Sequence, residues 1–473
     1  IATRSLRVEM ELDNRGKQRQ KELRLSVDGK TQTQKMVIKK GRSHVTLIYS
    51  MPTEAQLWSE FSPSVYQLTA SIPSVGTEKT VQFGLREVST QGNRLLVNGT
   101  PVFLRGTLEC CIFPLTGTPP TDEEGWQKVF STAQEYGLNH LRFHSWCPPD
   151  AAFRVADRMG FYLQVELPQW SLNVGKDEAT TRFIEAEADR ILREYGSHPS
   201  FLLMTCGNEL QPDFDVLNRL VAHMRQADPR HLYAASSFTF EEGHGKQPEP
   251  NDQFFVTQYT NRGWVRGQGV FDAEPPAFDK DFAKATAELG VPLISHEIGQ
   301  YAVYPNLAEI EKYTGTLLPL NFMAVRDDLQ RKGLLSQAAD WTKASGRLAA
   351  LLYKEEMERA MKSPGFCGFQ LLDLHDFPGQ GTALVGLLDA FWDSKGILSP
   401  AEFRQACSPV VVLSRFAKAS YKKGETFSAD IEVANYGAKD IQQPAALWKI
   451  IDSQGKAIAQ GRVVCDLARI GEV

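Results

Sequence analysis

The chain has 473 residues, 42% of them hydrophobic, and its 52 Lys and Arg residues against 57 Asp and Glu residues give a formal net charge of −5. This length accommodates about three domains, and charges without long runs of one sign predict neither a nucleic-acid nor a membrane partner. No apolar stretch reaches the roughly 18 residues of a membrane span, and seven cysteines without a CxxC pair indicate neither a zinc ribbon nor a complete disulfide framework.

The first 84 residues show short strand patterns separated by polar turns. Apolar residues alternate with polar ones over 6–12 and 23–27, and a further strand-like run follows at 45–48. Short strands at this spacing are typical of a β-sandwich, so we predict an immunoglobulin-like sandwich over residues 1–84. Because the chain opens within a strand pattern and without a signal peptide, we expect it to have been cut from a longer protein.

Between residues 85 and 405 the pattern changes to strands that alternate with helices. Strand-like runs fall at 102–105, 140–143, 162–166, 201–205, 232–236, 254–259, 293–296 and 366–371. Amphipathic segments fall at 123–136, 151–159, 179–195, 214–225, 278–288 and 339–361. Eight strands with helices between them predict a (β/α)8 TIM barrel. A doubly wound sheet is disfavoured because no Gly-rich phosphate loop follows the first strand.

Residues 406–473 return to strand alternation. Strand-like runs at 410–413, 426–433 and 446–451 are divided by turns such as 422–425. We therefore predict a partial C-terminal β-sandwich, truncated at residue 473, so that the fold class is a TIM barrel flanked by immunoglobulin-like β-sandwich domains.

Two glutamates end strand-like runs where such a barrel carries its reactive groups. Glu209 closes the run over 201–209, on the fourth strand, and Glu297 closes the run over 291–297, on the seventh. The C-terminal ends of barrel strands gather at one mouth, so these two side chains are expected to face each other across it. A glycosidase needs two such carboxyl groups, one to donate a proton and one to attack or to direct water.

The motifs around these glutamates follow one another in a recognisable order. Ser197-His198-Pro199-Ser200, followed by the apolar run that ends in Gly207-Asn208-Glu209, is similar to the HPS…GNE signature of glycoside hydrolase family 2. Segments 83–86, 98–106 and 137–142 resemble its barrel-entry and second-strand motifs, and the resemblance covers about residues 1–405. The resemblance to this β-galactosidase, β-glucuronidase and β-mannosidase family implies that Glu209 is the general acid/base and Glu297 the nucleophile, and that configuration is retained through a covalent glycosyl-enzyme. It also implies that the chain lacks the leading sugar-binding domain of the family.

Other residues at strand ends suit supporting roles. Arg142 ends strand two and is the best cation for Glu297, with a structural ion pair as the alternative. Tyr259 ends strand six; the family motif suggests that its hydroxyl donates to the nucleophile, and a rim aromatic is the alternative. Asn208 is expected to bond the sugar 2-hydroxyl. Apolar neighbours and the charge of Glu297 are expected to raise the pKa of Glu209.

Further candidates lie in loops around the expected mouth. They are a histidine after strand two, a glutamate ending strand three, three loop tryptophans and a histidine after strand eight: His144, Glu166, Trp146, Trp170, Trp264 and His375. Each tryptophan either stacks on a sugar or simply packs, the loop histidines are substrate contacts or surface groups, and the glutamate binds a hydroxyl or pairs with Arg142. His140 and His144 are four residues apart, but on a strand this spacing separates them by about 13 Å. No HExxH motif is present, so neither a metal nor another cofactor is expected.

The segments that would recognise the sugar depart from the family pattern. Residues 107–111 replace the Asn/His-rich loop of the galactosidases, residues 370–374 lack the usual strand-eight Trp, and the glucuronidases' Asn-x-Lys motif is not evident. We predict a retaining exo-glycosidase that removes a terminal β-D-galactoside, β-D-uronide or α-L-arabinopyranoside from an oligosaccharide or polysaccharide. A carbohydrate-binding barrel with lapsed catalysis is the alternative. The resemblance implies a periplasmic or secreted location, and the oligomeric state stays open.

Overall fold

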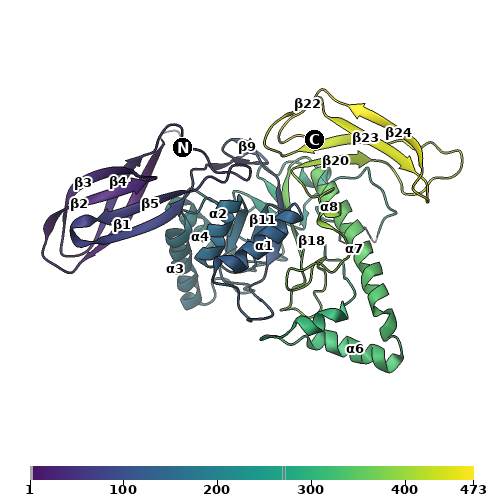
Figure 1. Ribbon diagram of the computed structural model, residues 1–473, viewed down its shortest axis with the longest axis horizontal. Coiled ribbons are helices and arrows are strands. Elements are labelled where there is room, and N and C mark those ends of the chain that lie inside the picture. The colour runs from purple at the N-terminus through teal and green to yellow at the C-terminus, as the bar shows by residue number, and fades with distance from the viewer. Residues whose placement is uncertain (1–3, 269, 272) are drawn as a thin grey trace.

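The structure is a computed structural model that describes residues 4–268, 270–271 and 273–473. A barrel of parallel strands occupies the middle of the molecule, with β-rich units at its upper left and upper right in Figure 1. The helix α6 (Leu320–Lys332) marks the opposite, lower side. No helix in this described part of the chain combines the length and the apolar character needed to cross a membrane.

The N-terminal unit is a β-sandwich of two antiparallel sheets. Its strands are β1 (Ser5–Asn14), β2 (Arg19–Val27), β3 (Lys30–Ile38), β4 (Gly41–Ser50), β5 (Tyr66–Ile72) and β6 (Thr77–Phe83), with a 3-10 turn at Pro73–Val75. One sheet pairs β1 with β4, and the other has the order β3-β2-β5-β6. Alternating apolar side chains such as Leu23, Leu25 and Leu47 are buried in one core. The predicted sandwich fold is confirmed.

A small antiparallel sheet leads from this unit into the barrel. It contains β7 (Val88–Gln91), β8 (Arg94–Val97) and β9 (Thr100–Pro101). The barrel strands are β10 (Leu104–Glu109), β11 (His140–Phe143), β12 (Tyr162–Glu166), β13 (Phe201–Thr205), β14 (Leu232–Ala234), β15 (Phe255–Thr257), β18 (Leu293–Ile298) and β19 (Phe366–Leu371). They pair in the order β14-β13-β12-β11-β10-β19-β18-β15, all parallel. A bridge from Ser237, just after β14, to Val256 of β15 joins the two remaining edges, so the predicted (β/α)8 barrel is confirmed.

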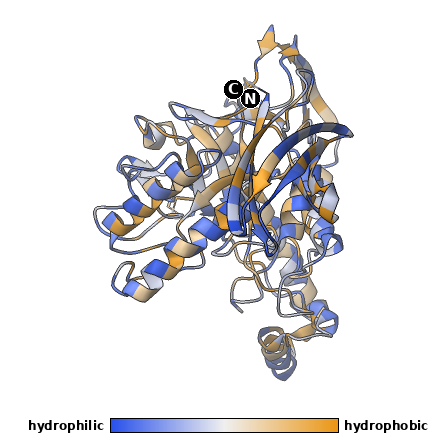
Figure 2. Cartoon of the chain, turned by 90° about the vertical axis from the view of Figure 1, so that its left-hand side faces the viewer, coloured by the Kyte–Doolittle hydropathy of each residue, from blue (hydrophilic) through white to orange (hydrophobic). Residues whose placement is uncertain are grey.

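Helices surround the barrel. They are α1 (Glu123–Glu135), α2 (Asp150–Met159), α3 (Glu178–Tyr195), α4 (Phe214–Ala227), α5 (Ala283–Thr286), α6, α7 (Ala338–Met361) and α8 (Pro400–Phe403), with 3-10 turns at Leu307–Lys312 and Leu335–Gln337. Figure 2 shows hydrophobic and hydrophilic residues alternating along these helices, as expected where one face meets a core and the other meets water. In α2, for example, Ala152, Phe153 and Ala156 are buried.

Several predicted elements differ from the structure. The helix predicted over 278–288 is reduced to α5, because Phe278 stacks on Phe416 at 4.4 Å between ring centroids and its N–H bonds the Phe416 carbonyl. The first barrel strand is β10 rather than 102–105, and it continues through Gly106. A side chain at Gly106 would collide with the His140 ring and the Phe369 carbonyl, so the glycine permits close packing there instead of ending the strand.

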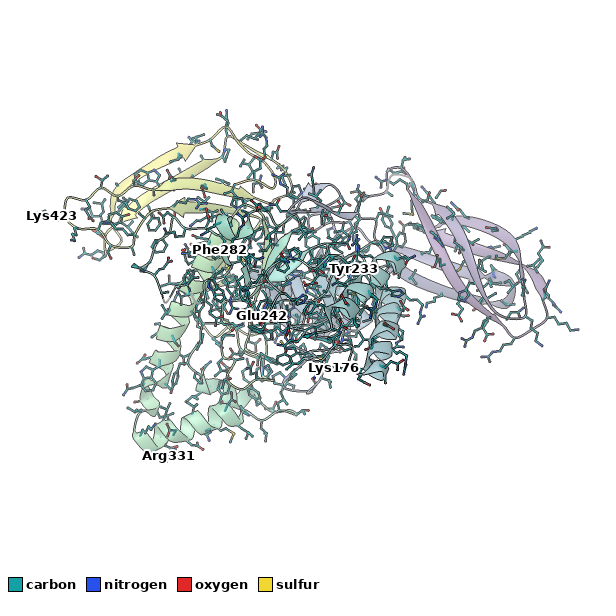
Figure 3. All side chains as sticks on the ribbon, turned by 180° about the vertical axis from the view of Figure 1, so that it is seen from behind. Lys176, Tyr233, Glu242, Phe282, Arg331 and Lys423 are labelled. Atoms are coloured by element: carbon teal, nitrogen blue, oxygen red, sulfur yellow. The ribbon has the colours of Figure 1, made fainter. Side chains whose placement is uncertain are left out.

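Strands five and six are shorter than predicted, because β14 ends at Ala234 and β15 spans only Phe255–Thr257. The chain then forms a small hairpin of β16 (Tyr259–Thr260) and β17 (Gly263–Trp264) at the mouth. The loops that follow the strands lie away from both β-rich units. Figure 3 shows this with Lys176, which follows β12, and Arg331 of α6, both on the lower side.

The C-terminal unit consists of paired antiparallel strands. They are β20 (Val410–Arg415), β21 (Asp430–Asn435), β22 (Ile441–Gln442), β23 (Ala445–Ile451), β24 (Ala457–Val464) and β25 (Leu467–Ala468). β20 pairs with β21, β22 with β25 and β23 with β24. Val411 and Leu413 of β20 belong to the main core that extends from the barrel.

A buried aspartate links the N-terminal sandwich to α2 and to the segment that precedes β13. Asp157, in α2, accepts hydrogen bonds from Gln82 Nε2 (2.8 Å) and from Ser200 N and Oγ (3.0 and 2.6 Å). Its Oδ2 lies 2.7 Å from Nδ1 of His198, and Trp58 Nε1 donates to its carbonyl at 2.6 Å. Burial lowers the pKa of His198, but hydrogen bonds to Asp150 and Asp157 outweigh it and raise this pKa to about 9.

We expect Asp157→Ala to lower the free energy of unfolding by about 3 kcal/mol, because it leaves a buried imidazolium with only the more distant and half-exposed Asp150 as a partner. Since the folded-state pKa of His198 lies above its ordinary value, this contribution is complete below pH about 6.5 and is lost as the pH rises through about 9. Urea unfolding of both proteins at pH 6 and pH 10 measures the difference.

The matched control is Asp189→Ala. Asp189 and His223 form a pair at the same 2.7 Å distance, but both side chains are about half exposed. We expect this change to alter stability by no more than about 0.5 kcal/mol at either pH. Equal effects of the two substitutions would contradict the role assigned to the buried pair.

Candidate active site

Glu209 lies four residues beyond the end of β13. Its backbone is held by the segment that follows β14, the fifth barrel strand. Its N–H donates to the Ser237 carbonyl at 3.1 Å, and Asn208 forms a parallel bridge with Ser237. The backbone of Glu209 is left-handed, with φ +49°. Gly207 precedes it with the Gln169 carbonyl packed so closely that no Cβ would fit there. The side chain is half-buried at the mouth of the barrel.

Glu297 lies within β18, one residue before its end, and is 6% exposed. Its backbone is also left-handed, with φ +50°. Two side chains donate to its carbonyl at 3.3 Å: Arg266, through Nη1, and Gln300, through Nε2. The backbone carbonyl of Glu297 therefore faces Arg266. Its side-chain carboxylate faces Arg142 of β11 and Glu209, which follows β13.

The structure brings the two predicted glutamates together. One carboxylate oxygen of Glu209, one of Glu297 and a ring nitrogen of His296 lie within 4.8 Å of one another. His296 Nε2 is 3.3 Å from Glu297 Oε1 and 3.0 Å from Asn208 Oδ1. Retaining glycosidases hold their carboxyl groups roughly 5–5.5 Å apart, and inverting enzymes roughly 6.5–9.5 Å. With one oxygen of each carboxyl group inside 4.8 Å, the pair is nearer to the shorter class.

Arg142 connects the predicted residues into one network. Its Nε donates to Glu166 Oε1 at 2.7 Å, its Nη1 lies 3.2 Å from Glu297 Oε1, and its Nη2 donates to Asn208 Oδ1. Burial lowers the pKa of Arg142, but Glu166 and Glu297 outweigh it and raise this pKa. Of the alternatives for Glu166, the structure places an ion pair with Arg142, and Ser145 Oγ donates to its other oxygen at 3.0 Å.

The two glutamates occupy different electrostatic environments. Burial and the nearby negative charge of Glu297 raise the pKa of Glu209 to about 7, as predicted from the sequence. Glu297 has the guanidinium of Arg142 beside it, and an adjacent positive charge favours an ionised carboxylate. At neutral pH a substantial fraction of Glu209 is therefore protonated while Glu297 faces a cation.

The cluster of Glu209, His296 and Glu297 also has the spacing of a cation site. Burial, followed by the charges of Arg142 and Arg266, lowers the pKa of His296, so its ring is neutral. A raised pKa on Glu209 and two adjacent guanidinium groups disfavour a bound cation. The arrangement suits proton transfer to a glycosidic oxygen better than metal binding.

Tyr259 is placed differently from the role suggested for it. Among the described residues its hydroxyl forms no hydrogen bond with Glu297; its ring instead packs edge-on against Phe238 and Trp264, with centroids 5.4 Å away in both cases. Trp264 is 44% exposed at the rim. Of the alternatives for Tyr259, the structure places a rim aromatic.

The loops after strands two and three bring a further pair of predicted residues to the mouth. His144 Nε2 is 3.8 Å from Glu297 Oε1, and Trp170, 64% exposed, packs edge-on against the His144 ring at 6.2 Å. Trp146 is instead packed against Trp126 and Phe143 and donates Nε1 to the Glu109 carbonyl at 2.9 Å. The packing alternative therefore holds for Trp146.

His375 lies outside the network of Arg142 and Glu297. It is 3% exposed and stacks on Trp392 at 4.2 Å, with Nδ1 3.3 Å from Asp373 and Nε2 3.8 Å from Glu109. Burial lowers the pKa of His375, but Asp373 and Glu109 outweigh it and raise this pKa to about 9. The arrangement is a buried charge cluster beneath the strand-one and strand-eight loops.

Sequence reasoning missed Arg266, which follows β17. It is 9% exposed and donates to the Glu297 carbonyl, and its Nε has no hydrogen-bond partner among the described residues. Burial lowers the pKa of Arg266. Its neighbours come from segments distant in sequence, so only the folded chain shows its place beside the two glutamates.

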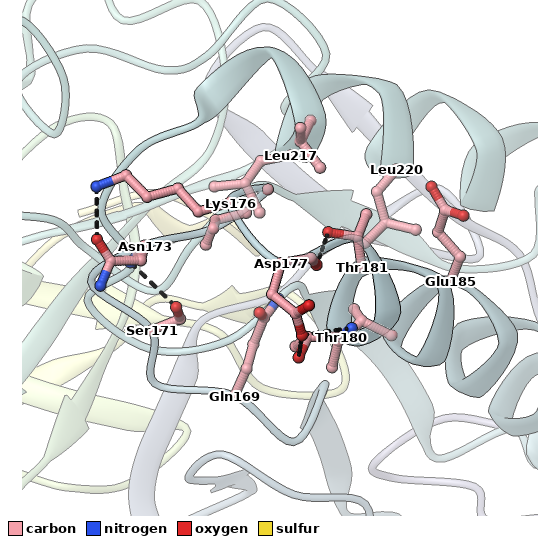
Figure 4. A pocket seen from close by; sticks show the side chains of 14 residues that line it. Gln169, Ser171, Asn173, Lys176, Asp177, Thr180, Thr181, Glu185, Leu217 and Leu220 are labelled. Carbon is pink, nitrogen blue, oxygen red and sulfur yellow. Dashed lines mark hydrogen bonds between the residues drawn. The ribbon is translucent and has the colours of Figure 1, made fainter.

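A cavity of about 350 Å³ lies beside the loop that follows β12 (Figure 4). The loop residues Gln169 and Lys176 meet the first turns of α3 and α4 there, over a floor that includes Ile184 and Leu217. Gln169 Nε2 donates to the Cys206 carbonyl at 2.7 Å, which ties this loop to the segment that carries Glu209. The cavity contains none of the predicted site residues.

Comparisons with known sequences give one family match and several distant relatives. A family model described as a domain of unknown function (DUF8488) matches residues 425–473. The β-galactosidase large subunit of Latilactobacillus sakei is 24% identical over 211 residues, which cover 40% of this chain and 33% of that protein. The matched region thus spans about a third of the length of this curated relative.

Solved structures show the same architecture. The exo-chitosanase of Amycolatopsis orientalis superposes with a TM-score of 0.65 at 16% identity, covering 98% of this chain and 56% of that one. A GH2 β-galacturonidase from Eisenbergiella tayi, bound to galacturonate, superposes with a TM-score of 0.62 at 14% identity, covering 85% and 69%. At such identities the likeness shows a shared fold.

Proposed function

We propose, on the premise that these comparisons support assignment of the chain to glycoside hydrolase family 2, that it forms the catalytic core of a retaining exo-glycosidase. Its substrate would be a terminal β-linked sugar of an oligosaccharide or polysaccharide, of the β-D-galactoside, β-D-uronide or α-L-arabinopyranoside type. Relatives named as β-galactosidases, a β-galacturonidase and an exo-chitosanase all act on glycosides, which supports a carbohydrate substrate.

The observation that carries this proposal is the placement of Glu209 and Glu297. One carboxylate oxygen of each lies within 4.8 Å of the other. Burial and the charge of Glu297 raise the pKa of Glu209 to about 7, while the Arg142 guanidinium lies 3.2 Å from Glu297. In the first step Glu297 would attack the anomeric carbon while Glu209 donates its proton to the departing oxygen. In the second step Glu209 would take a proton from water, which displaces Glu297 from the sugar.

Neighbouring residues would support both steps. Arg142 donates hydrogen bonds to both Glu297 and Asn208. It would therefore orient the attacking carboxylate of Glu297 and the amide of Asn208, which would contact the 2-hydroxyl. That contact strengthens as oxocarbenium character develops. The carbohydrate-binding alternative has no use for a glutamate whose pKa is raised to about 7 opposite an ion-paired one, so the catalytic proposal explains more of the site.

A panel of nitrophenyl glycosides tests the proposal. We expect hydrolysis of at least one of the β-D-galactoside, β-D-galacturonide, β-D-glucuronide and α-L-arabinopyranoside, and the product first released should have the configuration of the substrate by proton NMR. Sugar binding by calorimetry without hydrolysis of any member would favour the binding protein. Release of the inverted sugar would contradict the double displacement.

A further inference from the structure

Aromatic side chains lead from the centre of the site to the rim on the side of strands five and six. The Phe238 ring lies 5.3 Å from His296, 4.6 Å from Phe240 and 5.4 Å from Tyr259, and Tyr259 lies 5.4 Å from Trp264, all between ring centroids. His296 is buried at one end of this series, next to Glu297. Phe240 and Trp264 are 58% and 44% exposed at the other end.

Phe238, in the middle of this series, directly follows the residue that positions Glu209. The Glu209 N–H bonds the Ser237 carbonyl, and Phe238 follows directly, with its own N–H on the Val256 carbonyl at 3.0 Å. A general acid must lie within hydrogen-bond reach of the oxygen it protonates. That oxygen belongs to the leaving group, so the leaving group has to approach on the Glu209 side, where these aromatic rings are.

The backbone supports a functional reading of this segment. Phe238 is held in the left-handed region at φ +66°, a conformation that a bulky residue adopts only where surrounding structure imposes it, and such strain concentrates at functional sites. The strained turn directs Phe240 outward, where it covers little of the protein's own core. Phe240 and Trp264 thus present exposed aromatic surface at the rim, and the Tyr259 ring packs between Phe238 and Trp264.

We propose that Phe240, Tyr259 and Trp264 form the subsite for the leaving group and stack on the apolar face of the sugar ring next to the scissile bond. This inference rests on the proposed function and adds where the second sugar lies. Aromatic rings bury the C–H face of a sugar well because they are flat and apolar. Lys246 Nζ, 5.8 Å from the centroid of the Tyr259 ring, offers a hydrogen-bond donor at the edge of the same surface.

A pair of substrates that differ only in the leaving group tests the subsite. The sugar is the one hydrolysed best by the wild-type protein; one substrate carries a second sugar as leaving group, and the other is the β-fluoride, which has no ring to stack. We expect Phe240→Ala and Trp264→Ala each to lower kcat/KM for the disaccharide about tenfold more than for the fluoride. Trp264→Phe, which keeps a ring, should restore most of the disaccharide activity.

Phe183→Ala is the matched control, since Phe183 is a 52% exposed phenylalanine on α3, away from this series. It should affect both substrates equally. Equal losses on disaccharide and fluoride in the Phe240 and Trp264 variants, or no loss on either, would overturn the subsite while leaving the proposed function intact. Failure of the wild-type protein to hydrolyse any disaccharide, nitrophenyl glycoside or fluoride would overturn both.

Discussion

Replacing Glu297 with alanine is expected to lower turnover of an activated aryl glycoside by at least about 10⁴-fold, the scale seen when a covalent nucleophile is removed. The fold should survive, because the change removes a carboxylate rather than an apolar group from the mouth. Added azide should then restore activity, since it fits the space left by the carboxylate and attacks from the same face. The product should be the inverted, α-configured glycosyl azide, which NMR identifies.

The same experiment on Glu209→Ala provides the comparison. There the nucleophile is intact, so azide would intercept the glycosyl-enzyme and give the retained β-azide. Opposite configurations from the two variants would assign the two roles independently of any relative. If both variants gave the same azide, or if Glu297→Ala kept more than a hundredth of wild-type activity, the assignment of the nucleophile would be wrong.

We also expect the rate on a substrate with a poor leaving group to fall as the pH rises through about 7. The active form of Glu209 is protonated; because burial and Glu297 raise its pKa to about 7, that form is nearly complete at pH 5 and decreases about tenfold per unit well above pH 7. Glu209→Gln should remove this decrease in rate above pH 7, the alkaline limb of the pH profile, and lower the rate 10²–10⁴-fold. A dinitrophenyl glycoside, whose leaving group needs little protonation, should lose far less. The pH dependence of kcat/KM measures both effects.

Asp252 supplies a matched control for this pH profile. Burial raises its pKa to about 7 as well, but it accepts hydrogen bonds from Ala235 N and Glu249 N, away from the catalytic pair. The profile of Asp252→Asn should keep the limb near pH 7. If Glu209→Gln also kept it, another group would be the general acid.

Hydrophobic pattern was sufficient to locate most of the barrel. The runs at 140–143, 162–166, 201–205 and 366–371 coincide with β11, β12, β13 and β19, because buried parallel strands are continuous apolar runs bounded by polar residues. The pattern failed where tertiary contacts decide the outcome. Phe278 leaves its expected helix to stack on Phe416, and Gly106 continues a strand because neighbours pack against its bare backbone.

The candidate site residues also fall into a group that the strand pattern predicts and a group that depends on tertiary structure. Residues at strand ends, such as Arg142, Asn208 and Glu297, were found from the sequence because strand order alone brings them to one mouth. Arg266 and Phe240 follow short or irregular elements, and their directions depend on a hairpin and a left-handed turn that no periodicity encodes. A sequence motif likewise does not predict where the Tyr259 hydroxyl points, because the side-chain rotamer depends on local packing.

The left-handed backbone at Glu209 and at Glu297 also bears on how the proposed activity could be lost in evolution. A side chain held at such φ values costs about 1 kcal/mol or more at each position, and glycine would remove most of that cost. Mutations that abolish catalysis here therefore need not destabilise the fold. A gene copy freed from selection for hydrolysis would find glycine at either position structurally acceptable, and its product would persist as a folded barrel.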